Sequence, residues 1–221
     1  MHGTIKIFQI ISGLTLCTLS IASAFAEYEP NDNYSSFILS YQSTSFATPV
    51  CIGGECHEGL SGPQVVFTRQ IIPNLALGLS GSYLQSGGKS STIKSSNGSA
   101  FAEVIAGMGP SVDVGGSVAI LINSTQLCTA IPDFCTTISD NGADLGVFGK
   151  VFLKEDKSVS MTLSYDAVSY QQSANRTIVA LSLVTILAKH HRLALSVDRV
   201  RDTSGNAISG GYGFSYSYLV F

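Results

Sequence analysis

Alternation of apolar and small polar residues is the feature that most limits what this 221-residue chain can fold into. In the C-terminal segment GYGFSYSYLVF, aromatic or aliphatic side chains occupy every second position from Tyr212 to Val220, and glycine or serine occupies most positions between them. Successive side chains of a β-strand point to opposite faces of the sheet. The segment is therefore predicted to be a strand with one apolar face and one small polar face.

Similar runs of roughly ten residues recur along the chain and are separated by turn-forming residues. Two clear examples are NLALGLSGSYL at 74–84 and VSMTLSYDA at 159–167. We count ten candidate strands, of which three alternate less regularly, at 63–70, 100–108 and 177–187. The sequence predicts an all-β fold of ten strands, or of eight if two of the irregular segments are not strands.

The connections between the candidate strands also alternate in length. Long polar stretches follow the first, third and fifth strands, at 47–61, 86–98 and 124–142, whereas short turns follow the second, fourth and sixth. Long loops at one end and tight turns at the other are typical of up-and-down barrels in the bacterial outer membrane. A soluble sandwich has no reason to sort its loops in this way.

Strand length and composition agree with a membrane-spanning barrel. A strand of ten or eleven residues, rising about 3.3 Å per residue and tilted by about 45°, covers the apolar band of roughly 25 Å. Charged residues make up only 12% of the chain, about half of the usual share. Every backbone N–H and C=O needs a protein partner in hydrocarbon, so the sheet must close. We expect an up-and-down antiparallel transmembrane β-barrel with both chain ends on the periplasmic side.

The first 26 residues have the pattern of a secretory signal peptide. Lys6 precedes an apolar stretch at 7–23, and Ala24-Phe25-Ala26 forms a small-x-small cleavage site before Glu27. The alternative is a membrane-anchoring helix, because the apolar stretch approaches spanning length. We expect cleavage after residue 26, export to the outer membrane, and a single barrel domain at 27–221.

Four cysteines remain after the removal of Cys17, an even number that suggests disulfides in an exported chain. Three pairings are possible, and the spacing favours Cys51 with Cys56 and Cys128 with Cys135, each pair within one extracellular loop. The alternative is a metal site formed by Cys51, Cys56 and His57. Such short loops remove little chain entropy, so the bridges are expected to brace loops rather than hold the fold.

Over its whole mature length the chain resembles bacterial outer-membrane β-barrel proteins. The segment IIPNLALGLSGSYLQ at 71–85 looks like the turn-and-strand unit of small opacity-type and porin-like barrels. The resemblance implies that the barrel-assembly machinery recognises the C-terminal strand, with Leu219 and Phe221 as the assembly signal. It also implies contact with outer-membrane lipid and lipopolysaccharide. Four cations lie near the expected outer rim, where they either contact lipopolysaccharide phosphates or stay solvated: Lys89, Arg176, Arg199 and Arg201.

Five charged residues fall on the expected inner face, and we predict that they form a lumen charge network: Glu103, Asp144, Lys150, Asp166 and Asp198. Isolated charges are costly against a low-dielectric wall, so these groups should pair or meet water. In one interpretation Lys150 neutralises several acids and plugs a narrow barrel. In the other, the acids line a small cation-preferring path or form a proteolytic carboxylate group.

The function expected from these features is non-enzymatic: a small channel for ions or solutes, or a structural or surface-contact protein. The alternatives are a protease or lipid A-modifying enzyme at the barrel rim, and a secreted soluble adhesin. A rim enzyme needs a histidine near a serine or acid, but His190 and His191 fall in a predicted periplasmic turn and His57 has no evident partner in the sequence. No cofactor or metal is expected, and a net charge of −3 offers no basic patch for nucleic acid.

Overall fold

The computed structural model describes residues 30–130, 133–188 and 190–219. The predicted signal peptide, Cys17 and Phe221 lie outside these ranges. Ten strands make up the fold: β1 Ser36–Ile52, β2 Glu55–Ile72, β3 Leu75–Gly87, β4 Ser91–Gly107, β5 Val112–Ala130, β6 Asp133–Phe152, β7 Val159–Tyr170, β8 Arg176–Ala188, β9 His191–Asp202 and β10 Ala207–Leu219. In the ranges that the structure describes, no helix is long and apolar enough to cross a membrane.

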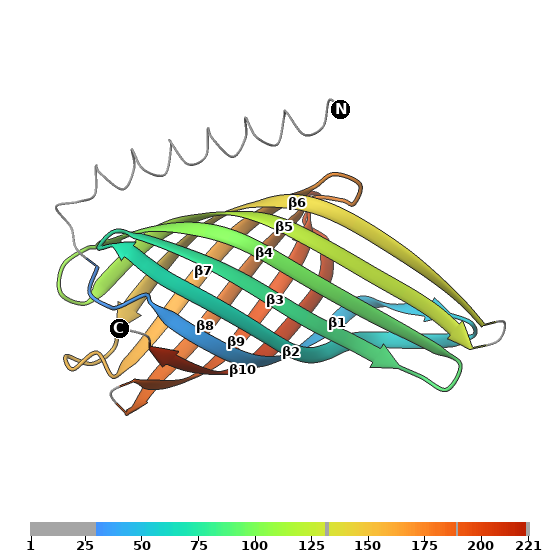
Figure 1. The fold of residues 1–221 in the computed structure, drawn as a ribbon, viewed down its shortest axis with the longest axis horizontal. Coiled ribbons are helices and arrows are strands. Elements are labelled where there is room, and N and C mark those ends of the chain that lie inside the picture. The colour runs from blue at the N-terminus through green and yellow to red at the C-terminus, as the bar shows by residue number, and fades with distance from the viewer. Residues whose placement is uncertain (1–29, 131–132, 189, 220–221) are drawn as a thin grey trace.

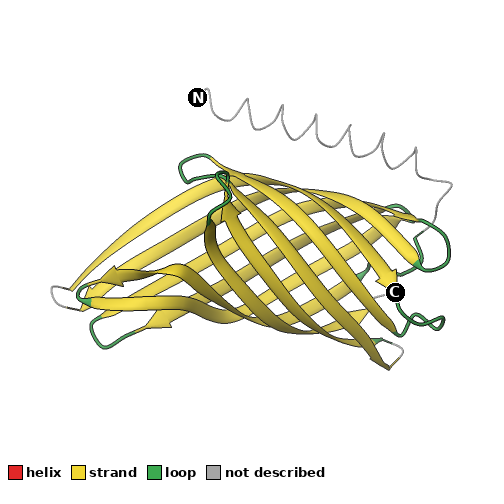
Figure 2. Ribbon diagram, turned by 180° about the vertical axis from the view of Figure 1, so that it is seen from behind, coloured by secondary structure: helices red, strands yellow, loops and turns green. Residues whose placement is uncertain are grey.

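The strands form one closed barrel in which each strand is antiparallel to both of its neighbours in the barrel. The first and last strands close it, paired from Ser36 with Leu219 to Phe46 with Ser209. The strands of the near wall cross those of the far wall at a steep angle (Figures 1 and 2). The predicted all-β, up-and-down barrel of ten strands is confirmed.

The two faces of the wall follow the alternation in the sequence. On β10, Tyr212 and Phe214 point outward with 65% and 50% of their surface exposed. The alternating residues Gly213 and Ser215 point inward and are only partly exposed. The exterior is a belt of exposed apolar side chains that includes Leu79, Leu145, Leu163 and Leu195.

One prediction about the connections was wrong. The stretches 47–61, 86–98 and 124–142 are not long loops, because the strands continue through most of them to tight turns (Figure 1). As a result β5 and β6 have 19 and 20 residues, whereas β7 and β9 have 12 each. The second and third of these segments are rich in serine and threonine, of which threonine is β-branched and favours extended backbone.

We call the parts of β1–β6 that continue past the short strands the extension (47–60, 86–97 and 124–141). β6 pairs with β7 only as far as Gly142 and Tyr170, and β1 pairs with β10 only as far as Phe46. The extension is therefore an open sheet. We call this end of the barrel the extended end, and the opposite end, which carries residues 30–35 and Leu219, the terminal end.

Candidate functional site

Four acids from the predicted charge network lie on the inner face of the barrel: Glu103 on β4, Asp144 on β6, Asp166 on β7 and Asp198 on β9. Asp166 is close enough to Glu103 and to Asp144 to interact electrostatically with both. Its carboxylate lies over Gly146, where an added Cβ would come within 2.2 Å of Asp166 Oδ1. The Asp198 carboxylate covers Gly211 in the same way, at 2.6 Å. Glycine thus makes room for two of the inward carboxylates.

Lys150, the fifth predicted member, is not brought together with these acids. Its ammonium group forms an ion pair with Asp32, which precedes the first strand. Asp32 also accepts two hydrogen bonds from Arg192, Nη1 to Oδ2 at 2.8 Å and Nη2 to Oδ1 at 2.6 Å. One carboxylate therefore joins two cations from different strands of the wall, β6 and β9, which are separated by β7 and β8.

Further contacts hold residues 30–35, which we call the latch, in the terminal end. Asn31 donates hydrogen bonds from its backbone N–H and its side-chain amide to Asp113 Oδ1, at 2.7 and 2.8 Å. The Tyr34 hydroxyl donates to Asp113 Oδ2 at 2.9 Å. Lys150 Nζ lies 5.1 Å from the centre of the Tyr34 ring. Sequence reasoning missed the latch, although its polar and acidic residues follow the predicted cleavage site directly.

Burial along the inner face changes from the middle of the barrel to the terminal end. Serines in the middle are partly exposed, among them Ser40, Ser80, Ser99, Ser164 and Ser196. Around the latch the inner residues are buried, including Ala76, Ile105, Asp113, Lys150 and Phe152. The lumen thus has space beside its central residues and is filled where the latch sits.

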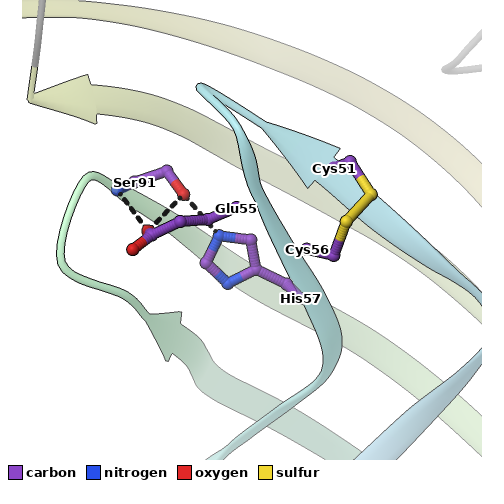
Figure 3. The surroundings of a disulfide bond; sticks show 5 residues. All are labelled: Cys51, Glu55, Cys56, His57 and Ser91. Carbon is purple, nitrogen blue, oxygen red and sulfur yellow. Dashed lines mark hydrogen bonds between the residues drawn. A yellow bond between two sulfur atoms is a disulfide. The ribbon is translucent and has the colours of Figure 1, made fainter.

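A second polar cluster joins the turns at the extended end (Figure 3). The Glu55 carboxylate accepts hydrogen bonds from the backbone N–H groups of Lys89, Ser90 and Ser91, at 2.8 to 2.9 Å, and from the Ser91 hydroxyl at 3.0 Å. The His57 ring nitrogens contact Ser86 Oγ at 2.9 Å and Ser91 Oγ at 2.7 Å. His57, which had no evident partner in the sequence, therefore bridges two serines.

This cluster lacks the geometry of a hydrolytic site. The acid contacts the Ser91 hydroxyl and not the imidazole, so it does not orient His57 as a base. Ser91 and His57 are only 3% and 4% exposed, which leaves no approach for a substrate. The cluster instead fixes the β3–β4 turn against the β1–β2 hairpin.

The disulfides form as the spacing favoured, Cys51 with Cys56 and Cys128 with Cys135. Each joins cross-strand partners near the tip of its hairpin. The rival metal site at Cys51, Cys56 and His57 is not formed, because both sulfurs are in the bridge (Figure 3). No cluster of three metal-ligating side chains occurs within the described part of the chain.

Hydrogen bonding from the backbone of Ser90 and from the Ser91 hydroxyl favours the ionised form of Glu55 and holds the pKa of its carboxyl below the ordinary 4.5. The bracing is therefore present above pH 4.5 and is lost as the pH falls through the lowered pKa. We expect Glu55→Gln to loosen the turn at neutral pH and to raise the rate of trypsin cleavage after Lys89 several-fold. Glu58→Gln, an exposed change on the same strand, is the control, and equal cleavage of both variants would contradict the bracing role.

Of the predicted assembly residues, Leu219 ends β10 and is 5% exposed. Its backbone N–H donates to the carbonyl of His190 at 2.9 Å. His191 lies at the terminal end, where its ring contacts the Tyr216 hydroxyl. These histidines therefore lie beside the aromatic rings of β10, at the opposite end of the barrel from His57.

No protein-family model matches the chain, and no curated protein matches it in sequence. Several solved structures are similar to it. Ail, the attachment invasion locus protein of Yersinia pestis, is 9% identical, with a TM-score of 0.44 over 85% of this chain and 98% of Ail. KdgM porin is 7% identical, with a TM-score of 0.45 over 83% of this chain and 99% of the porin. The outer membrane protein OprG from Pseudomonas aeruginosa is 10% identical, with a TM-score of 0.44 over 87% of this chain and 100% of OprG. Outer-membrane proteins are thus among the structures to which this chain is similar.

Proposed function

We propose that this protein is an outer-membrane barrel that conducts small cations and is closed at its periplasmic end by the latch. The membrane placement is supported by the closed sheet, which leaves no unpaired edge in the barrel wall. It is also supported by the apolar exterior, where Leu79, Leu145 and Leu195 are 61 to 62% exposed. In this orientation the terminal end faces the periplasm and the extension stands outside the cell.

The charge on the inner face is the observation that carries the cation preference. Glu103, Asp144, Asp166 and Asp198 have no cationic partner among the ion pairs of the described residues. At the terminal end, Lys150 and Arg192 are both paired with Asp32, and Lys157 donates to the backbone carbonyl of Asn31. A narrow passage lined by one sign of charge concentrates counter-ions and favours their passage.

The conductance of the mature chain in a planar bilayer under a salt gradient tests this function. With the latch opened by Asp32→Asn, we expect a reversal potential that favours cations. Adding Asp144→Asn and Asp166→Asn should shift it toward anions, because Lys150 and Arg192 then dominate the charge of the passage. Asp156→Asn, in an exposed turn at the terminal end, should leave the reversal potential unchanged. If the Asp32→Asn variant carries no current, the proposed channel function is wrong.

A surface-contact role is the second candidate and is favoured by the extension. Its hairpin tips are braced by two disulfides and by the Glu55 cluster, and the edge of β6 at 133–141 pairs with no strand on its β7 side. A strand edge of this kind can pair with an extended segment of another protein. The same conductance measurement separates the two candidates, since a barrel that serves only to present the extension would carry no current even with the latch opened.

A further inference from the structure

The outer face of β7–β9 carries a groove toward the extended end, with a volume of about 630 Å³. Its wall includes the apolar or aromatic side chains of Tyr165, Val179, Leu181 and Val197, and two basic residues, Arg199 and Arg201. The groove thus combines an apolar wall with two guanidinium groups.

The two arginines point to the same side of the wall because they are two residues apart on β9. Arg199 is the cross-strand partner of Val179, and Arg201 is the partner of Thr177. Both arginines are exposed, and neither belongs to an ion pair among the residues that the structure describes. Two like charges are therefore held close together, and neither is paired with a carboxylate.

Asp198 and Asp202 also line the groove, but neither forms an ion pair with these arginines among the described residues. Asp198 points to the lumen, where its carboxylate lies over Gly211. Asp202 accepts hydrogen bonds from the backbone N–H groups of Ser204 and Asn206, at 2.9 and 2.8 Å, within the β9–β10 turn. The guanidinium groups are thus left to attract an anion from outside the protein.

The outer face of β9 changes from apolar to basic along the strand. Leu195 and Val197 are 62% and 55% exposed, and Arg199 and Arg201 follow toward the extended end. On β8 the exposed Leu183, Leu181 and Val179 run beside them. An acyl chain would lie along the apolar part, and an anionic headgroup would then stand level with the arginines. Guanidinium binds phosphate through paired hydrogen bonds, so phosphate suits this position best.

We propose that the groove binds a phosphorylated, acylated glycolipid of the outer leaflet, of the lipid A type, with a phosphate held by Arg199 and Arg201. The inference rests on the outer-membrane placement proposed above but not on ion conduction. A barrel that fails to conduct would leave it intact.

The test is native mass spectrometry of the detergent-purified mature barrel titrated with lipid A. We expect the Arg199→Ala/Arg201→Ala double variant to bind at least about tenfold more weakly, since each cation near an anionic lipid surface contributes appreciably. Arg69→Ala is the matched control, because Arg69 is also exposed on the outer face but near the opposite end of the barrel. It should retain wild-type affinity. The gel mobility of unheated samples shows that each variant is folded.

Three further ligands show which anion the arginines bind: dephosphorylated lipid A, inorganic phosphate and phosphatidylglycerol. Dephosphorylated lipid A should bind the wild type as weakly as lipid A binds the double variant, and inorganic phosphate alone should neither bind nor compete. Competition by inorganic phosphate would assign the arginines to a free anion and overturn the lipid site. Equal affinity of the wild type and the double variant for lipid A would overturn it as well, and so would binding of phosphatidylglycerol to the wild type as tightly as lipid A binds.

Discussion

Asp32→Asn is expected to convert a barrel that is closed most of the time into one that is open most of the time. Asparagine keeps the size of the side chain but removes the charge that holds Lys150 and Arg192. Both cations are nearly buried in the closed state, with 9% and 12% of their side chains exposed. Removing one partner from a buried ionic group typically costs about 3–5 kcal/mol, because the remaining charge is left uncompensated. The closed state should therefore lose about a hundredfold or more in occupancy.

Single-channel recording measures this effect as the fraction of time spent open. Asp156→Asn removes a carboxylate from an exposed turn at the same end and should behave as the wild type. The Asp113→Asn variant should have an intermediate effect, because the hydrogen bonds from Asn31 and Tyr34 persist in weaker form. An open fraction that is the same in wild type and Asp32→Asn would show that the latch does not gate the passage.

Gly62→Ala is expected to destabilise the barrel by about 3 kcal/mol or more, the upper part of the range for forced overpacking. An added Cβ at Gly62 would lie 2.0 Å from the backbone carbonyl oxygen of Tyr83. Backbone cannot move aside as a side-chain end can, so β2 and β3 would have to separate locally. The methyl group of alanine would therefore break hydrogen bonds between β2 and β3 around this position.

Gly81→Ala on the neighbouring strand is the matched control. The nearest heavy atom to a Cβ at Gly81 is 3.9 Å away, which is ordinary contact. That change should be neutral or slightly stabilising, because alanine restricts the unfolded chain. Urea unfolding of the barrel in lipid vesicles measures both variants. Equal midpoints for Gly62→Ala and Gly81→Ala would contradict the close approach of β2 and β3.

The barrel fold could be predicted from the sequence. Side-chain alternation is a local property of a strand, so Tyr212, Phe214 and their neighbours indicated an apolar outer face without any knowledge of their partners. The disulfide pairs were also local, since Cys51 and Cys56 are five residues apart and Cys128 and Cys135 are seven apart. The extension was missed because the residues that it buries on β4 are Ser91, Ile93 and Ser95, so its buried and exposed positions do not differ consistently in polarity. Its strands therefore carry little periodic signal.

The functional contacts were decided by closure of the barrel. Asp32 is separated by 118 residues from Lys150 and by 160 from Arg192, and only the ring of ten strands brings the three together. The hydrogen bond between His57 and Ser91 likewise depends on how two hairpins pack against each other. Sequence alone determined which side chains face outward and favoured the cysteine pairs that form, because period and spacing act within one strand or hairpin. Tertiary structure decided which inward charges meet. The interaction between two charges depends on their separation in space and on the exclusion of water, and the linear sequence specifies neither of these directly.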